Sequence, residues 1–320
     1  MSRLKEISED PMLQEFAQGA ATEAVQPVAD FLAPTVDVPT SIGRFKRYSL
    51  KNRFRIPNTR RGVGGRANEI RFSAEDATYS CEPNALDYPV DNLEQLEAKG
   101  LENMFREGAV AIAEIAGLAH EKKVIDLALA AAGAGEDYVW DKDGDPVKDL
   151  DAAILSVIKS ANYGSAMGIG MLFGATAWSI FKNAPKVAGK FIVGGQAGPG
   201  GYAIPTEQGA TGLFVGRPEI RTSYMVFDDA PEGIDKDIKF MLDTTILVFT
   251  RKQNPTRSDP SFMKTFRLAG QWMKPGAYSR DDGRVEVAKF DWSEDIRVTN
   301  DEGVVRLNIA DTAPAPGPGQ

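Results

Sequence analysis

The sequence predicts an α+β fold, because one long helical stretch is followed by a series of separate strands. Apolar residues at helical spacing run toward Ala132, and short apolar strands recur from residue 166 onward. Strands and helices do not alternate regularly, so neither a barrel nor a doubly wound parallel sheet is expected. The 320 residues, of which 42% are hydrophobic and 26% charged, suffice for a sizeable core.

The composition limits the chemistry that the chain can perform. Its one cysteine, Cys81, cannot form an internal disulfide, which is typical of a reducing compartment. Its one histidine, His120, excludes a histidine-based catalytic triad and a multi-histidine metal site. We expect His120 to be a surface or cap residue and Cys81 to be a small packed side chain. Carboxylate or lysine chemistry stays possible on composition and would need support from the spacing of motifs. Without such support, we expect a protein that is not an enzyme and that has no cofactor or metal.

Three short motifs resemble ligand-binding patterns without matching them. Residues 168–174 depart by one position from the dinucleotide fingerprint, and residues 184–191 lack the first glycine and the final hydroxyl of a phosphate loop. The closely spaced carboxylates of residues 141–145 suit calcium. Their glycine comes two residues too early for a helix–loop–helix site, and Ala152 stands where that site needs glutamate. A polar turn beside Pro146 is the favoured interpretation.

Residues 160–181 are long enough to be considered as a membrane span, because no charge lies between Lys159 and Lys182. Glycines and polar residues within this stretch make a strand, a tight turn and a helix the better interpretation. Residues 1–10 are charged and lead into no apolar segment, so no signal peptide is predicted. We expect a soluble protein with no membrane partner.

Residues 1–43 are expected to form an N-terminal arm. Prolines at positions 27, 34 and 39 forbid a continuous helix and favour extended chain. The apolar side chains of this arm need a surface to cover them, and we expect that surface to belong to another subunit. The arm residues assigned to this contact are Phe31, Leu32, Val36 and Val38.

A basic, glycine-rich stretch follows the arm. Alternating apolar residues in 48–54 and 70–74 predict the two strands of a long hairpin, and the glycines between them predict its tip. Residues 44–71 contain ten basic residues and one acidic residue, a net charge of +9. Residues 75–102 contain eight acidic residues and one basic residue, a net charge of −7.

These oppositely charged stretches are either solvated faces or partners in a contact. A hairpin that projects from the body reaches a neighbouring copy more easily than its own chain, so we expect the contact to lie between subunits. Its basic side is assigned to Arg47, Lys51, Arg53, Arg55, Arg60, Arg61 and Arg66. Its acidic side is assigned to Glu82, Asp87, Asp91, Glu94 and Glu97.

The clearest secondary-structure prediction is the helix that ends at Ala132. Asp91 and Glu94 resemble a capping box at its start, and Gly133 is expected to end it. A helix of this span would reach ~60 Å. Three glycines lie inside it, namely Gly100, Gly108 and Gly117. They indicate bends or close packing, and a break in the helix near Gly117 is considered. Further helices are predicted at 149–161 and 175–187, and strands at 166–173, 221–227, 244–249, 262–268, 284–290 and 304–309.

Three stretches together resemble the major capsid proteins of tailed bacteriophages with the Hong Kong 97 fold. They are Ala29–Thr40 (ADFLAPTVDVPT), Thr78–Asp91 (TYSCEPNALDYPVD) and Leu172–Val187 (LFGATAWSIFKNAPKV). In the third stretch, a tryptophan precedes a short helix that ends near a proline. The resemblance covers about residues 28–309 and rests on the order of the elements more than on invariant residues.

The resemblance implies an N-terminal arm, an extended β-hairpin loop, a peripheral domain with a long spine helix, and an axial domain. The implied boundaries are 1–43 for the arm, 44–78 for the extended loop, 79–148 for the peripheral domain, 149–271 for the axial domain, 272–311 for strands that return to the peripheral domain, and 312–320 for a disordered tail. It also implies hexamers and pentamers in an icosahedral phage head that encloses double-stranded DNA. No position matches the lysine–asparagine crosslink of some family members.

The expected partners are further copies of the chain, with portal, scaffolding and decoration proteins and non-specific proximity to packaged DNA. Any scaffold is expected to be a separate protein, because no long helical segment precedes the arm. The expected location is the virion capsid, after assembly in the host bacterial cytoplasm. Two other classes remain open: an encapsulin-like shell around cargo enzymes, and a nucleic-acid-binding module. The net charge of −8 and the few aromatics among the basic residues disfavour the module.

Overall fold

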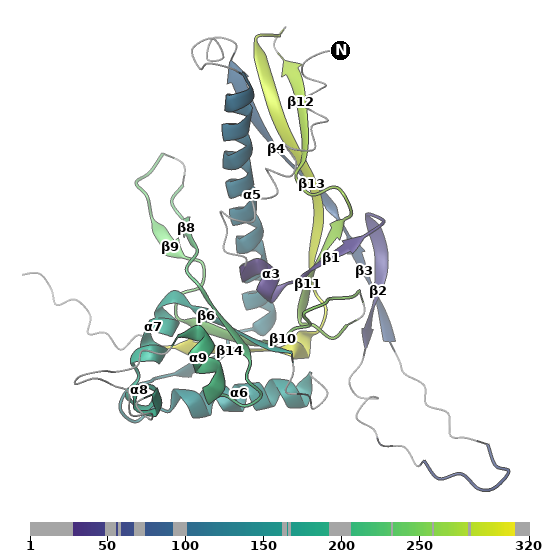
Figure 1. Cartoon of the computed structure of the whole chain (residues 1–320), viewed down its shortest axis with the longest axis vertical. Coiled ribbons are helices and arrows are strands. Elements are labelled where there is room, and N and C mark those ends of the chain that lie inside the picture. Colours follow the sequence, from purple (N-terminus) through teal and green to yellow (C-terminus); the bar gives the residue numbers. More distant parts are fainter. Residues whose placement is uncertain are drawn as a thin grey trace, which may run out of the picture.

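The computed structural model describes most of the chain. The described residues are 28–48, 56, 59–66, 74–91, 101–161, 165, 168–191, 206–231, 233–257, 259–280 and 283–310. Helices and strands both contribute to them, which confirms the expected α+β class. Figure 1 shows an elongated molecule, with a tall part built on one long helix and a broad part that holds several shorter helices.

The tall part is a five-stranded sheet around one long central strand. That strand is β13 (Val285–Val298), and β4 (Glu82–Asp91) pairs along one of its edges. The other edge pairs with β11 (Met263–Leu268) and then with β12 (Lys274–Arg280). The sheet is completed by β1 (Thr35–Val38), which runs parallel to β11. We call this the long sheet.

The helix α5 (Leu101–Ala132) covers one face of the long sheet (Figure 1). Its 32 residues correspond to a length of about 48 Å at 1.5 Å per residue. Ala113 and Ala116 on one stripe of the helix share a core with Phe290 and Trp292 of β13. The small alanines let the helix lie close to these aromatic rings.

The end of α5 is as predicted, because the helix stops at Ala132 and Gly133 adopts a φ of +72°. The helix runs unbroken through Gly108 and Gly117, so the break that was considered near Gly117 does not occur. Residues 92–100, which include most of the predicted first turns, lie outside the described part of the chain.

The broad part contains a second five-stranded sheet in the order β5-β14-β10-β6-β7. Its strands are β5 (Glu136–Tyr138), β14 (Val304–Ile309), β10 (Thr245–Thr250), β6 (Ile169–Gly174) and β7 (Glu219–Ser223). Every residue of β6 and β10 is buried, because successive side chains enter two different cores. Burial on both faces explains why these strands have unbroken apolar sequences instead of an alternating pattern.

Helices and the long sheet cover the two faces of this second sheet. One core holds Phe173 of β6 with Trp178 and Phe181 of the following helix, and the other holds Leu172 with Val124 and Ile125 of α5. The helices and helical turns of the broad part and the arm are α3 (Val28–Leu32), α6 (Pro146–Ser160), α7 (Ala175–Asn183), α8 (Pro185–Phe191), α9 (Glu207–Ala210), η2 (Thr211–Leu213) and η4 (Asp301–Gly303).

Residues 160–181 contain the end of α6, the strand β6 and the start of α7, as the strand, turn and helix interpretation predicts. Among the described helices, none is both long enough and apolar enough to cross a membrane.

The structure corrects the predicted domain boundaries. The range 149–271 included β11, which belongs to the long sheet, and the range 272–311 included β14, which belongs to the second sheet. The range 79–148 included β5, which pairs with β14. These errors have one cause: a strand's sheet is decided by its distant pairing partner, and the local sequence does not encode that partner.

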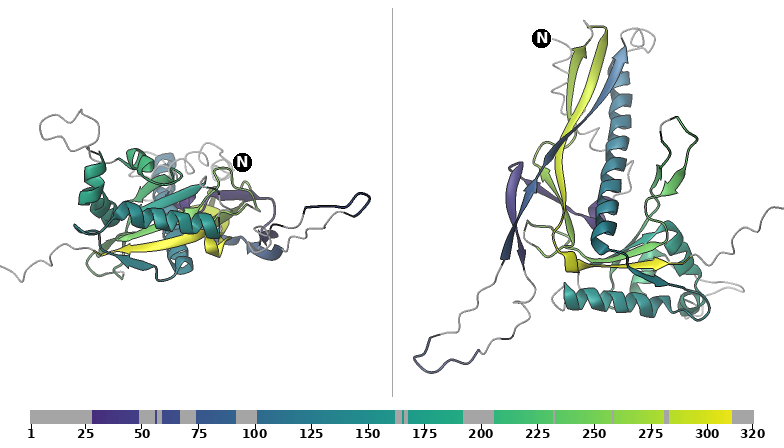
Figure 2. Two further views of the ribbon diagram at one scale, coloured as in Figure 1. Left: turned by 90° about the horizontal axis from the view of Figure 1, so that it is seen from below. Right: turned by 180° about the vertical axis from the view of Figure 1, so that it is seen from behind.

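Two hairpins leave the body on opposite sides of α5. The front view in Figure 1 and the view from behind in Figure 2 both show this arrangement. One pairs β2 (Ile42–Tyr48) with β3 (Ala74–Ser80), and the other pairs β8 (Val226–Asp228) with β9 (Ile238–Phe240). The first hairpin was predicted, but most of its predicted strand residues, 49–54 and 69–73, lie outside the described part. The sequence did not predict the second hairpin as a separate element.

Candidate assembly surfaces

The described arm residues belong to the protein's own core, which corrects the expectation that another subunit covers them. Phe31 and Leu32 of α3 pack with Phe249 of β10 and with α5, and Val36 and Val38 of β1 pack with Phe266 of β11. All four are buried without any partner chain. The reason is that β1 completes the long sheet, and that residues 28–32, which were expected to be extended, form the helix α3 packed on α5 and the second sheet.

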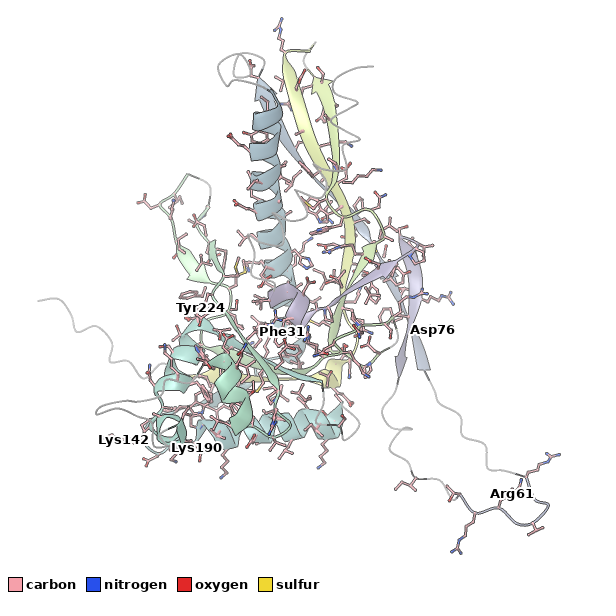
Figure 3. All side chains as sticks on the ribbon, in the orientation of Figure 1. Phe31, Arg61, Asp76, Lys142, Lys190 and Tyr224 are labelled. Atoms are coloured by element: carbon pink, nitrogen blue, oxygen red, sulfur yellow. The ribbon has the colours of Figure 1, made fainter. Side chains whose placement is uncertain are left out.

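Phe31 is the anchor of this segment on the second sheet, and Figure 3 shows it at the junction of the tall and broad parts. Its ring meets that of Phe249 edge to face at 5.3 Å between centroids. The guanidinium groups of Arg221 and Arg251 lie 4.9 and 4.8 Å from the ring centroid. Glu219 forms ion pairs with both arginines, which fixes the two cations beside the ring.

Two adjacent residues of α5 form buried polar contacts beside α3 and β13. Glu121 accepts a hydrogen bond from the backbone N–H of Ala29 at 3.0 Å, and its other carboxylate oxygen has no hydrogen-bond partner. Burial raises the pKa of Glu121 to about 7, against a lowering effect of that hydrogen bond. His120 is also buried, with Nδ1 3.0 Å from Glu294, so its assignment to the surface or a cap was wrong. Nothing in the sequence near His120 indicated Glu294, which lies 174 residues away.

Cys81 is a packed side chain, as predicted. It lies buried beside Val38 and Phe266, and its thiol donates to the carbonyl of Phe266 at 3.5 Å. Burial and nearby carboxylates raise the pKa of this thiol, which keeps it protonated.

The turn at residues 141–145 also has its predicted form. Asp141 accepts hydrogen bonds from the backbone N–H groups of Asp143 and Gly144, and Asp145 caps α6 by accepting from Lys148. These carboxylates are thus engaged by backbone donors. In the part of the chain that the structure describes, no group of three or more histidine, cysteine or acidic residues is arranged to hold a metal ion.

The basic hairpin has a paired base and an exposed tip. In the register of β2 and β3, Lys46 lies opposite Asp76 and Arg47 opposite Glu75. The basic and the acidic stretch therefore run side by side as the two strands at the base of one hairpin. The contact expected between copies stays a prediction.

The tip of this hairpin carries the predicted basic residues that the structure describes. We define the loop tip as residues 59–66 together with Ile56. Arg60, Arg61 and Arg66 are exposed in it, and Figure 3 shows Arg61 far from both sheets. Ile56 is 93% exposed, and Val63 is fully exposed. Both side chains are therefore available for contact with another surface. Lys51, Arg53 and Arg55 lie outside the described residues.

The predicted acidic face is only partly described. Glu82, Asp87 and Asp91 are exposed on β4, whereas Glu94 and Glu97 lie outside the described residues. Asp87 accepts a hydrogen bond from the hydroxyl of Tyr278 on β12 at 2.8 Å. This carboxylate therefore already has a partner in its own chain.

The β8–β9 hairpin is the surface that the sequence analysis missed. In its register Val226 lies opposite Phe240 and Asp228 opposite Ile238, so these four side chains share one face. Val226, Ile238 and Phe240 are all exposed. A turn around Pro231 and Gly233 between two apolar runs could have indicated this hairpin.

No family model matches the sequence. The curated major capsid protein of Pseudomonas phage JBD67 is 29% identical over 169 residues, which are 50% of this chain and 52% of that protein. The chain thus spans about half the length of the curated relative that it matches.

Solved structures share the fold over most of the chain at low sequence identity. A phage-related protein from Bordetella bronchiseptica RB50 matches with a TM-score of 0.70 and 19% identity, over 93% of this chain and 96% of that chain. The mature capsid of bacteriophage PhiM1 matches with a TM-score of 0.54 and 10% identity, over 88% and 86%. The SrpI encapsulin from Synechococcus elongatus PCC 7942 matches with a TM-score of 0.53 and 13% identity, over 88% and 86%. The chain therefore has the capsid fold, which occurs in phage heads and in encapsulins.

Proposed function

We propose that the protein is the major capsid protein of a tailed bacteriophage. Its copies assemble into the hexamers and pentamers of an icosahedral head that encloses double-stranded DNA. The observation that carries the proposal is the capsid fold, which matches a phage-related protein over 93% of the chain. The sequence similarity to a phage major capsid protein favours a phage head among the shells that have this fold.

In this proposal the long sheet and α5 form the peripheral domain, with α5 as the spine helix. The second sheet and its helices form the axial domain, and the β2–β3 hairpin with the loop tip forms the extended loop. The apolar side chains of α3 and β1 tie the two sheets of one subunit together. The exposed loop tip is left to contact a neighbouring copy.

The charges of the extended loop set orientation more than affinity, because exposed ion pairs contribute little free energy and mainly exclude wrong arrangements. Arg60, Arg61 and Arg66 are the proposed basic residues of this contact whose side chains the structure describes. Its remaining proposed basic residues are Arg47, Lys51, Arg53 and Arg55. The sequence assigns the acidic side to Glu82, Asp87, Asp91, Glu94 and Glu97, and the β8–β9 hairpin is a second acidic surface that could take this role.

Electron microscopy of the purified protein tests this function. The expected result is closed particles of uniform diameter whose faces resolve into five- and six-membered rings. A protein that stays monomeric at all concentrations and salt conditions would contradict the proposal. The further partners that we propose are portal, scaffolding and decoration proteins, and the assembled particles are the material in which to look for them.

An encapsulin-like compartment is the second candidate, favoured by the match to the SrpI encapsulin over 88% of the chain. The contents of particles from the native host separate the two candidates. Particles that contain DNA or are empty support the phage head, whereas particles that contain one enzyme in stoichiometric amount support a compartment. A nucleic-acid-binding module would instead be a monomer whose DNA affinity falls steeply with salt.

A further inference from the structure

The β8–β9 hairpin has one anchored face and one face that is about half exposed. On the inner face, the ammonium group of Lys122 on α5 lies 4.5 Å from the centroid of the Phe227 ring. On the outer face, Val226, Ile238 and Phe240 are 41%, 55% and 43% exposed. Tyr224, just before β8, is 50% exposed. A ribbon with three residue pairs is marginal in water, so burial of this outer face against a partner would stabilise it.

The same hairpin is acidic. Residues 224–240 contain five acidic residues and two basic residues, a net charge of −3. One of the two cations, Lys239, is already bound by Asp229 and Asp237 at 2.7 and 2.9 Å. Asp235 lies exposed near the turn of the hairpin. The surface is therefore an apolar strip beside an excess of negative charge.

The loop tip has the complementary character. Residues 56–66 contain three arginines and no acidic residue, a net charge of +3. Ile56 and Val63 add two exposed apolar side chains to these charges. Each of the two projections thus combines apolar groups with one sign of charge, and the signs are opposite. Such complementarity selects one arrangement of two surfaces over others.

The two projections cannot meet in one molecule, because they leave the body on opposite sides of α5 (Figures 1 and 2). A ring of identical subunits is built from head-to-tail contacts, in which one edge of each copy meets the opposite edge of the next. Two complementary projections on opposite edges are the arrangement that such a ring requires.

We propose that the loop tip of one copy docks on the outer face of the β8–β9 hairpin of the next copy in the ring. This inference rests on the proposed function, since it needs copies that assemble. The hairpin fits this role better than β4. The hairpin exposes Val226, Ile238 and Phe240, whereas no large apolar side chain of β4 is among the exposed ones.

Crosslinking of assembled particles tests the contact. The variant V63C/I238C places one thiol on each surface, and the single natural cysteine, Cys81, is buried. A short bis-maleimide tolerates a wider separation than the ~6 Å between Cα atoms that a disulfide needs. The matched control is V63C/L155C, because Leu155 is 51% exposed on α6 and close to Ile238 in exposure. We expect a ladder up to pentamers and hexamers for V63C/I238C, and no ladder for the control or for either single variant.

The outcomes separate this contact from the proposed function. Particles of V63C/I238C that crosslink no more than the control would overturn the contact and leave the shell intact. A wild-type protein that forms no particles would overturn both. If the cysteine pair itself prevents assembly, the charge swap decides. R61E and D235R should each lower the assembled fraction severalfold, and the double variant should recover it. If the loss of assembly in the double variant equals the sum of the losses in the two single variants, the contact is overturned.

Discussion

Glu121 places a carboxyl group with one partnerless oxygen between α5 and the start of α3. Its pKa of about 7 lies above the ordinary 4.5, so between these pH values the folded subunit binds more protons than the unfolded chain. The free energy of unfolding therefore falls as the pH rises. The contribution of Glu121 is complete below pH 4.5 and is lost as the pH passes about 7.

The variant E121Q cannot ionise, and its amide oxygen can still accept from Ala29. We expect the free energy of unfolding of dissociated subunits to fall between pH 5 and 8 by about 2.5 kcal/mol more in the wild type than in E121Q. Urea denaturation at several pH values measures this difference. The control E114Q removes an exposed carboxyl group from the same helix and should keep the wild-type slope. Equal slopes in E121Q and wild type would contradict the assignment.

Phe31 shows why the arm could not be placed from sequence. Its apolar neighbours and spaced prolines predict a segment that needs cover, and that part of the interpretation is confirmed. The identity of the cover depends on Phe249 and two arginines more than 180 residues away, and local sequence carries no information about them.

The variant F31A tests how firmly this segment is anchored. Truncation leaves a cavity beside Phe249 and removes the ring between Arg221 and Arg251, so we expect a loss of about 3–5 kcal/mol in the free energy of unfolding. The midpoint of urea denaturation measures it. The exposed Val139 provides a control, since V139A should change the stability by less than about 0.5 kcal/mol. A loss in F31A no larger than in V139A would show that α3 is not part of the core.

At the scale of elements, α5 illustrates what local sequence does predict. The end of the helix follows from Gly133, because a positive φ is easy only for a residue without a side chain. The glycines inside the helix were predicted to mark either bends or close packing, and Gly108 marks close packing. A Cβ added there would lie 2.4 Å from the ring of Tyr88 on β4. The sequence could not tell packing from bending, because Tyr88 comes from another element.

At Gly108, helix propensity and side-chain packing predict opposite effects of an alanine substitution on stability. Alanine would favour the helix by ~1 kcal/mol, but overpacking against Tyr88 costs about 1–3 kcal/mol. We expect G108A to be destabilised by about 1 kcal/mol in urea denaturation. The control G212A has no atom within 4 Å of the added Cβ and should be nearly neutral. A stabilised G108A would mean that the helix and β4 are farther apart than the structure has them.

At the scale of the whole molecule, the order of elements was predicted better than their pairing. Most strands of the second half were found near their observed positions, yet β11, β14 and β5 were placed in the wrong sheet. The charge asymmetry correctly indicated a basic projection, since Arg61 lies far from both sheets. The basic stretch is not wholly separate from the acidic one, because Lys46 and Asp76 occupy opposite positions in the register of β2 and β3.

The central claim is that the basic tip joins separate copies instead of stabilising its own subunit. Its most direct test is the fraction of protein in particles, measured by sedimentation velocity for the variant R60E/R61E/R66E. The matched control is K142E/K148E/K190E, which changes the net charge equally at three exposed lysines of the broad part. We predict that the arginine variant stays folded and largely unassembled, while the lysine control assembles as the wild type does. Normal particle formation by the arginine variant would contradict the account.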